Sequence, residues 1–354
     1  MKRPNLLGEF AFAIGFSLLC LIGSFIYGVT NHGMDLALEF VLITLILGIM
    51  ELSLSFDNAV VNATVLQKMT PIWQHRFLTW GILIAVFGMR FLFPLLIVAV
   101  VAGMGFAEVV TLAFNDPETY SERLTEAHVS ISAFGGSFLM LVFLSYFLDP
   151  DKGVHWLGKF EEWLGKLGSV QAVQIFLTGV FLLLAVHYLV PTEEQFAGLM
   201  SGVIGILVYI LVKGLSNLFE AEEEAVIGEV ARGGFLSFLY LEVLDASFSL
   251  DGVIGAFAIT KEIVIISLGL AIGAVFVRSF TLLMVHQGTL QTYRFLEHGA
   301  HYGIGSLAVI MLLSLSPNIQ IPEVVTGLIG VFFIGLAVWW SMRYNRLEGS
   351  KQAQ

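Results

Sequence analysis

The sequence predicts an all-α polytopic membrane protein with about ten transmembrane helices and two inverted three-helix repeats. Of its 354 residues, 57% are hydrophobic and only 13% are charged, a composition outside the range of soluble domains. Apolar runs long enough to cross a bilayer recur along the whole chain. Two of these runs carry the same pattern of acidic and hydroxyl residues, which indicates an internal repeat.

The apolar runs define the predicted spans. They lie at about 10–30, 36–66, 78–102, 128–148, 170–190, 197–218, 235–259, 262–286, 302–316 and 323–342. The first run follows Lys2 and Arg3, has span length and lacks an Ala-x-Ala cleavage pattern, so we expect a retained helix rather than a signal peptide. The single cysteine, Cys20, excludes an intrachain disulfide and a cysteine-based metal site.

Lysine and arginine residues outside the spans orient the chain. Twelve lie at the two ends and in the loops at 67–77, 149–169, 219–234 and 287–301, whereas the intervening loops hold only Arg123 and Lys261. Cytoplasmic loops are enriched in these residues, so both termini are expected in the cytoplasm and the chain in a bacterial inner membrane or its equivalent.

The internal repeat relates the second predicted span to the seventh. Glu51 matches Asp245, Ser53 matches Ser247, Ser55 matches Ser249, Asp57 matches Asp251 and Asn58 matches Gly252. The next spans continue it, because Gly81 to Arg90 has the spacing of Gly269 to Arg278. Spans five apart run in opposite directions, so the repeats are inverted, and such repeats place a substrate site at their midplane interface.

This repeat divides a single transmembrane domain, 1–354, into parts. The first repeat covers 36–148 and the second 235–316, and a last helix follows at 323–342. Between the repeats, 149–234 holds an amphipathic surface helix from Trp156 to Leu167, two spans and an acidic linker.

Ionisable residues at membrane depth indicate a functional site. A carboxylate near a helix centre costs roughly 2.5 to 3.5 kcal/mol unless it is paired, protonated or bound to a cation. The spans contain five acids and two arginines, Arg90 and Arg278, so up to three negative charges remain for protons or a metal ion. The five acids are Glu51, Asp57, Glu242, Asp245 and Asp251. The alternative is that the acids and arginines are structural pairs that hold the bundle together.

Helical geometry places the acids on different faces. At about 100° per residue, Glu51, Ser55 and Asn58 share a stripe that excludes Asp57. A second stripe, with Glu242, Asp245 and Ser249, excludes Asp251. Either both helices are surrounded by protein, or they unwind near these serines. Both arrangements bring the acids to a shared interior, where we expect Asp57 and Asp251 to bridge one cation.

The donor set consists of oxygen atoms, which suit Mn²⁺, Mg²⁺ or Ca²⁺ rather than copper or zinc. The predicted metal ligands are Glu51, Asp57, Asn58, Asp245 and Asp251. The predicted supporting residues are Ser53, Ser55, Glu242, Ser247, Ser249, Arg90 and Arg278.

The two acidic segments resemble signatures of a known family. Glu51-x-x-Leu54-Ser55-x-Asp57-Asn58-Ala59 is similar to the first signature of the TerC/Alx family of integral membrane proteins, and Glu242-x-x-Asp245-x-x-Phe248-Ser249-x-Asp251 to the second. The resemblance implies export of a divalent metal ion, Mn²⁺ before Ca²⁺ or Mg²⁺, with the acids of the two signatures as ligands. Two positions depart from the family pattern: Ser249 replaces an alanine, and Gly252 replaces a serine.

Three functional classes remain open at this level. The first is a secondary transporter, not an enzyme, that exports a divalent cation; proton exchange would follow from the surplus of acids. The second is an intramembrane aspartyl hydrolase using Asp57 and Asp251, but neither residue stands in a Gly-x-Gly-Asp motif. The third is a membrane assembly factor in which the acids are structural.

Other features of the sequence limit the partners. The chain has no phosphate-binding loop and no basic nucleic-acid patch, so its expected partners are the metal ion and the lipid bilayer, and a homo-oligomer is left open. His128 and His301 occupy related positions at the starts of their spans, and we expect interfacial roles before ligand roles.

Overall fold

The computed structural model is built from helices. It describes the backbone of 6–168, 172–223, 230–319 and 321–352, and within these ranges no β-strand occurs. Side chains are described except at 1–9, 78, 167–171, 215–233, 250, 251, 254, 320, 323, 324 and 348–354. The backbone of 224–229, the acidic side chains of the predicted linker and the side chain of Asp251 lie outside this description. The all-helical prediction is confirmed.

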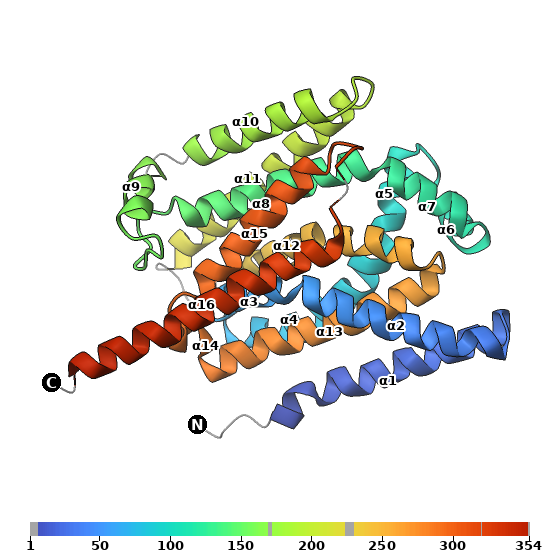
Figure 1. Cartoon of the computed structure of the whole chain (residues 1–354), viewed down its shortest axis with the longest axis horizontal. Coiled ribbons are helices and arrows are strands. Elements are labelled where there is room, and N and C mark those ends of the chain that lie inside the picture. The colour runs from blue at the N-terminus through green and yellow to red at the C-terminus, as the bar shows by residue number, and fades with distance from the viewer. Residues whose placement is uncertain (1–5, 169–171, 224–229, 320, 353–354) are drawn as a thin grey trace.

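The helices follow one another with short connections. They are α1 (Leu6–Asn31), α2 (Met34–Leu54), α3 (Phe56–Leu66), α4 (Pro71–Leu83), the π-helix η1 (Ile84–Leu92), α5 (Phe93–Val101), α6 (Phe106–Asn115), α7 (Pro117–Glu126), α8 (His128–Phe147), α9 (Lys159–Gly168), α10 (Ala172–Leu189), α11 (Gln195–Glu223), α12 (Val230–Ile259), α13 (Ile263–Gln287), α14 (Thr289–Thr292), α15 (Leu296–Leu313) and α16 (Glu323–Gln352). Most of the long helices lie roughly along the long axis of the molecule in Figure 1.

Eight helices of the described residues are long and apolar enough to cross a membrane. They include the continuous run Pro71–Val101, which joins α4, η1 and α5. α12 and α15, at the predicted spans 235–259 and 302–316, are not among the eight, and both carry ionisable side chains within their length. The membrane-protein class follows from these helices, because exposed leucine, isoleucine and phenylalanine side chains also cover α1, α2, α10 and α11.

Several helices pack around the acidic segments of α2–α3 and α12. α13 contacts α2 along much of its length and also packs on α1, α3 and η1. α12 contacts η1, α3, α8 and α13, and α15 lies between α8 and α16. In Figure 1, α12, α3 and α13 run through the middle of the bundle, while α1 and α10 lie at opposite edges. The acidic segments on α2–α3 and α12 are therefore surrounded by protein.

The predicted span 36–66 is interrupted in the structure. α2 ends at Leu54 and α3 begins at Phe56, because Ser55 adopts φ −102° and ψ 15°. α12 has no matching break and continues through Glu242, Asp245 and Ser249. Of the two arrangements the sequence allowed, a break thus occurs in the first acidic segment and an unbroken, buried helix in the second.

The run after α4 changes from an α-helix to a π-helix. η1 covers nine residues, and Arg90 lies in its last turn. π-helical turns widen the helix by one residue per turn and often lie at functional sites. The change of helix type sets the direction in which Arg90 leaves the backbone.

The predicted surface helix from Trp156 to Leu167 corresponds largely to α9, Lys159–Gly168. Phe160 and Trp163 are exposed on it, whereas Glu161 is fully buried and pairs with Lys152. The helix thus has the apolar outer surface expected of an interfacial anchor.

Candidate functional site

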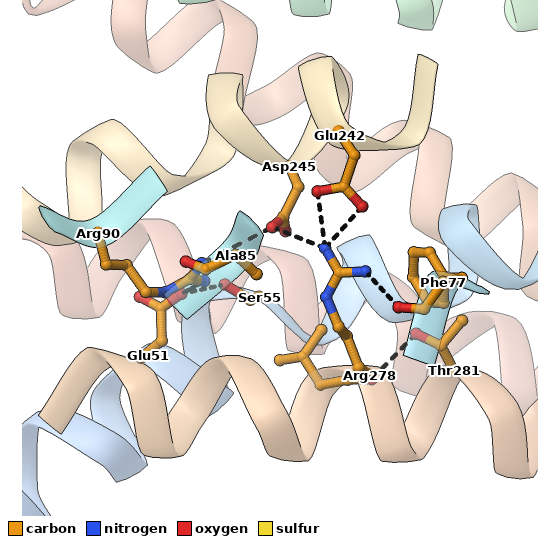
Figure 2. A network of polar contacts seen from close by, with 10 residues as sticks. Glu51, Ser55, Phe77, Ala85, Arg90, Glu242, Asp245, Arg278 and Thr281 are labelled. Atoms are coloured by element: carbon orange, nitrogen blue, oxygen red, sulfur yellow. Dashed lines mark hydrogen bonds and ion pairs between the residues drawn. The ribbon is translucent and has the colours of Figure 1, made fainter. Parts of the chain in front are cut away.

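Five buried ionisable side chains form one chain of ion pairs between α2, η1, α12 and α13 (Figure 2). Its members alternate in sign and are at most 5% exposed; in order they are Glu51, Arg90, Asp245, Arg278 and Glu242. We call them the ion-pair chain. The prediction that both arginines pair with acids of the site is confirmed.

Glu51 and Arg90 make the first end of the ion-pair chain. The Arg90 Nη2 donates to Glu51 Oε1, and its Nη1 donates to the Ala85 carbonyl at 2.9 Å. The carbonyl of Ala85 lies five residues earlier, within the π-helix. Ser55, at the break between α2 and α3, donates its hydroxyl to the same Glu51 oxygen at 3.1 Å. The helix break and the π-helix therefore hold the two ends of one ion pair.

Arg278 and Glu242 make the other end. Arg278 Nη2 lies 3.1 Å from both carboxylate oxygens of Glu242, and its Nη1 donates to the Phe77 carbonyl at 3.1 Å. The guanidinium carbon also lies 4.2 Å from the centre of the Phe77 ring. Hydrogen bonds and the aromatic face thus fix this arginine on several sides.

Asp245 lies between the two arginines but is held less tightly. Its Oδ2 is 3.6 Å from Arg90 Nη1 and 3.5 Å from Arg278 Nη2, and it accepts no hydrogen bond among the described residues. These are ion-pair distances longer than a hydrogen bond. Three carboxylates share two guanidinium groups, so the ion-pair chain keeps a surplus negative charge whenever all its members are ionised.

Glycines make room for the ion-pair chain. A Cβ at Gly81 would overlap the Arg278 guanidinium and lie 2.8 Å from Glu242 Oε1. A Cβ at Gly273 would come within 2.5 Å of the Glu51 side chain, and one at Gly252 within 2.7 Å of Glu51 Oε2. The last contact brings the α12 backbone beside Asp251 against the Glu51 carboxylate.

Asp57 lies apart from the ion-pair chain. It is 5% exposed, and its carboxylate accepts the backbone N–H of Asn58 at 3.0 Å. Cβ atoms at Gly303 and Gly330 would lie 3.2 and 3.3 Å from Asp57 Oδ2, so the carboxylate faces α15 and α16. No described arginine or lysine lies within ion-pair distance of it.

Other buried oxygens on α3 also lack donors. Asn58 and Asn62 lie one turn apart, and the side-chain oxygen of each has no hydrogen-bond partner among the described residues. Most buried acceptors in proteins are satisfied, so these two orphaned amide oxygens on the helix of Asp57 need an explanation.

The structure also places the remaining predicted residues. Ser53 is exposed and donates to the Ile49 carbonyl at 2.8 Å, so it points away from the ion-pair chain. Ser247 is buried and donates to the Val243 carbonyl, whereas the buried Ser249 hydroxyl has no described partner. The predicted bridge between Asp57 and Asp251 stays a prediction. Among the described side chains, no three histidine, cysteine or acidic residues converge as a ready metal site.

Sequence reasoning missed Asn62 and the glycines. Asn62 follows Asn58 by four residues, and that spacing was a usable signal for a shared helix face. The packing roles of Gly81 and Gly252 have no signal in a single sequence. Of the two histidines, His128 lies 3.3 Å from the Ser132 hydroxyl, and His301 stacks on Tyr146 with ring centres 3.8 Å apart.

Comparison with known protein families identifies the family of this chain. A family described as "Protein of unknown function (DUF475)" matches residues 56–348, most of the chain. The chain belongs to the DUF475 family. The match spans α3 to α16 and so includes Asp57, both arginines and the acids of α12. Comparisons with curated proteins and with solved structures each found no match.

Proposed function

We propose that this DUF475 member is a membrane transporter that exports a divalent metal cation, with Mn²⁺ preferred over Ca²⁺ and Mg²⁺. The observation that carries the proposal is Asp57, a buried carboxylate without a described cationic partner, on the helix that also holds two unsatisfied amide oxygens. A buried charge that stays unpaired is costly, and membrane proteins retain such groups chiefly along ion pathways.

The ligand chemistry supports a hard cation. A carboxylate and two amide oxygens offer three oxygen ligands of the kind that Mn²⁺, Mg²⁺ and Ca²⁺ accept. The Glu51 carboxylate lies near the α12 backbone at Gly252, one residue after Asp251. Both proposed ligand segments therefore approach the same interior region from opposite helices.

In this proposal the arginines are built-in counter-charges. The Oδ2 of Asp245 is held at 3.5 and 3.6 Å by two arginines and accepts no described hydrogen bond, so Asp245 is the acid of the ion-pair chain that an incoming cation would most readily recruit. Proton uptake by the empty site would balance the surplus carboxylates, and this motivates proton exchange as the coupling.

The proposal includes ten spans and two inverted repeats. Glu51 and Asp245, matched positions in the two acidic segments, both pair with Arg90. α13 packs on α2, and the η1 segment packs on α12, which is the reciprocal arrangement expected of two such repeats. The distribution of lysine and arginine residues supports cytoplasmic termini, and the proposal includes an inner-membrane location.

A membrane assembly factor is the second candidate. It is favoured by the ion-pair chain itself, because three of the five predicted acids are paired with arginine rather than left for a ligand. In that case purified protein would show no metal-dependent stabilisation, whereas a ligand that binds the folded state stabilises it by mass action.

Flux measurement tests the proposal. Purified protein in proteoliposomes should move Mn²⁺ across the bilayer, and Asp57→Asn should abolish this movement while the variant still inserts and folds. Absence of flux and of Mn²⁺-dependent stabilisation in the wild type would contradict the transporter and favour the assembly factor.

A further inference from the structure

A polar cavity lies between α8, α11, α12 and α15, apart from the ion-pair chain. Its volume is about 370 Å³, which is in the range of sites that hold small organic groups. Exposed Lys68 and buried His301 both line it, so the cavity leads from the surface into the bundle. The lysine, arginine and acidic residues of its lining are Lys68, Lys152, Lys213, Arg294, Asp149 and Glu297.

The lining carries a surplus of positive charge. Lys152 is fully engaged, because its ammonium group pairs with Glu161 and also donates to two backbone carbonyls. The other three cations, Lys68, Lys213 and Arg294, share the lining with only two carboxylates. When all these groups are ionised, the unengaged part of the lining therefore holds a single net positive charge.

Two of the cations keep donors for a ligand. Lys213 is half-buried on α11, donates to the Tyr209 hydroxyl at 2.9 Å and has no carboxylate within ion-pair distance among the described residues. Lys68 makes neither a hydrogen bond nor an ion pair with any residue that the structure describes. An ammonium group has three N–H donors, and an anionic oxygen is their strongest partner. The donors of both lysines therefore suit an anion.

Hydrogen-bond acceptors lie on the same walls. The Nδ1 of His301 lies 2.8 Å from the Glu297 carbonyl, which only accepts, so Nδ1 carries the ring proton and Nε2 keeps a lone pair. The Glu297 carboxylate accepts no hydrogen bond from the described residues. A ligand that combines a negative group with hydroxyl groups would satisfy both the lysine donors and these acceptors.

Helix α9 indicates the depth of the cavity in the bilayer. Glu161 of α9 is fully buried and pairs with Lys152 of the cavity lining, so α9 is joined to the cavity wall. Phe160 and Trp163 of the same helix are 58% and 57% exposed, as expected of side chains at the lipid–water interface. The cavity thus lies at the depth of the phospholipid headgroups.

We infer that this cavity binds a phosphate group, and that its ligand is the headgroup of an anionic phospholipid with free hydroxyls, such as phosphatidylglycerol. Lys68 and Lys213 donate to the phosphate, while Glu297 and His301 accept from the headgroup hydroxyls. Basic pockets between membrane helices on the cytoplasmic side are typical binding sites for anionic headgroups. The inference goes beyond the proposed transport function and does not depend on it.

Charge separates this ligand from two related ones. A phosphodiester carries one negative charge, which balances the single positive charge of the unengaged lining. A phosphate monoester carries roughly 1.5 to 2 negative charges at pH 7. Phosphatidylethanolamine carries no net charge, because its ammonium group cancels the phosphate. The lining therefore favours the anionic phospholipid over both.

Native mass spectrometry on the purified protein tests the inference. Delipidated protein is titrated with phosphatidylglycerol and, separately, with phosphatidylethanolamine. The wild type should retain one phosphatidylglycerol with an affinity about tenfold above that for phosphatidylethanolamine, the effect of about one charge-assisted hydrogen bond. Equal retention of the two lipids would overturn the inference.

Lysine variants test whether the lipid is bound in the cavity. Lys68→Gln and Lys213→Gln should each weaken phosphatidylglycerol binding about tenfold, because each removes a charged donor. Lys68 is exposed, so its replacement leaves the fold intact. Lys159→Gln removes an exposed lysine of α9 outside the cavity lining and should leave binding unchanged. An equal loss in all three variants would show general attraction to a basic surface and overturn the site.

Inorganic phosphate distinguishes the two sources of a phosphate group. Added at millimolar concentration, it should displace little phosphatidylglycerol, because its charge exceeds that of the lining and it has no acyl chains to bury. Complete displacement would overturn the assignment to a phospholipid and indicate a soluble phosphate compound instead.

Discussion

The two acidic segments share a sequence pattern but differ in structure. The first, 51–58, is interrupted at Ser55, and its two acids separate: Glu51 joins Arg90, and Asp57 turns toward α15 and α16. In the second, an unbroken helix presents Glu242 and Asp245 to the same arginine. The same sequence pattern thus produces acids paired with arginine, in the ion-pair chain, and an acid without a described cationic partner, Asp57. The local backbone conformation determines which acid is paired.

The largest effect should come from breaking the paired segment. Arg278→Ala would leave Glu242 and part of Asp245 as buried, unpaired charges, which destabilises a protein by about 3 to 5 kcal/mol. Thermal unfolding of the purified variant in lipid nanodiscs measures this loss. Arg278→Lys should lose less, because the charge survives although the bidentate geometry is lost.

A compensating change serves as the control. Combining Arg278→Ala with Glu242→Gln should recover part of the lost stability, since one unpaired charge is removed with its partner. A single variant as stable as the wild type would show that the ion-pair chain contributes little to folding.

The second prediction separates the two kinds of acid. Asp57→Asn should abolish Mn²⁺ flux and cellular Mn²⁺ tolerance, with the unfolding temperature unchanged or raised because a buried unpaired charge is removed. Asp245→Asn should instead lower the unfolding temperature, because both arginines lose a carboxylate. If both variants fail to accumulate in the membrane, Asp57 is structural and the contrast between the segments disappears.

The third prediction uses the matched serines. Ser55→Ala removes the hydroxyl that donates to Glu51 and should cost about 1 kcal/mol of unfolding free energy. Ser249→Ala, at the equivalent position of α12, removes a buried hydroxyl without a described partner and should be neutral or slightly stabilising. Equal effects in chemical denaturation would mean that the hydrogen bond at the helix break has no special role.

The smallest effect concerns the ion pair between Lys152 and Glu161, which lies outside both acidic segments. It provides a reference for the effects predicted within them. Burial opposes ionisation of Glu161, but its bonds with Lys152 and the Leu157 backbone N–H outweigh burial and lower its pKa. This stabilisation is present above the ordinary glutamate pKa and is lost as pH falls through the lowered one. Limited proteolysis of 149–168 at decreasing pH should show this loss in the wild type, whereas Glu161→Gln should be cleaved more readily already at neutral pH.

Much of the ion pairing was predictable from the sequence, because a charged side chain buried in a membrane must be paired, protonated or bound to an ion. Five acids and two arginines in the apolar runs needed partners, and the four acids whose side chains are described are all buried. Pairing of Arg90 and Arg278 with these acids followed from the same argument. Helix positions also followed, since span length is set by bilayer thickness.

What the sequence could not predict depends on backbone detail. On an unbroken helix, Ser53 and Asp57 are four residues apart and would share a face. In the structure Ser53 is exposed and Asp57 is buried, because the helix is interrupted between them at Ser55. The π-helix before Arg90 has no composition that distinguishes it from an α-helix. A polar cavity of about 370 Å³ is lined by side chains of α8, α11, α12 and α15 and leaves no local pattern in the sequence.

The π-helix carrying Arg90 has a consequence for how the chain tolerates insertions and deletions. A π-helical turn is an α-helical turn with a surplus residue, so removing one residue between Ile84 and Gly88 would restore regular winding there and leave the following turns facing as before. The arginine would keep its direction toward Glu51 and Asp245. In family alignments, a single-residue gap in this stretch should therefore be tolerated, and the spacing of the arginine from Gly81 records which winding a given relative uses.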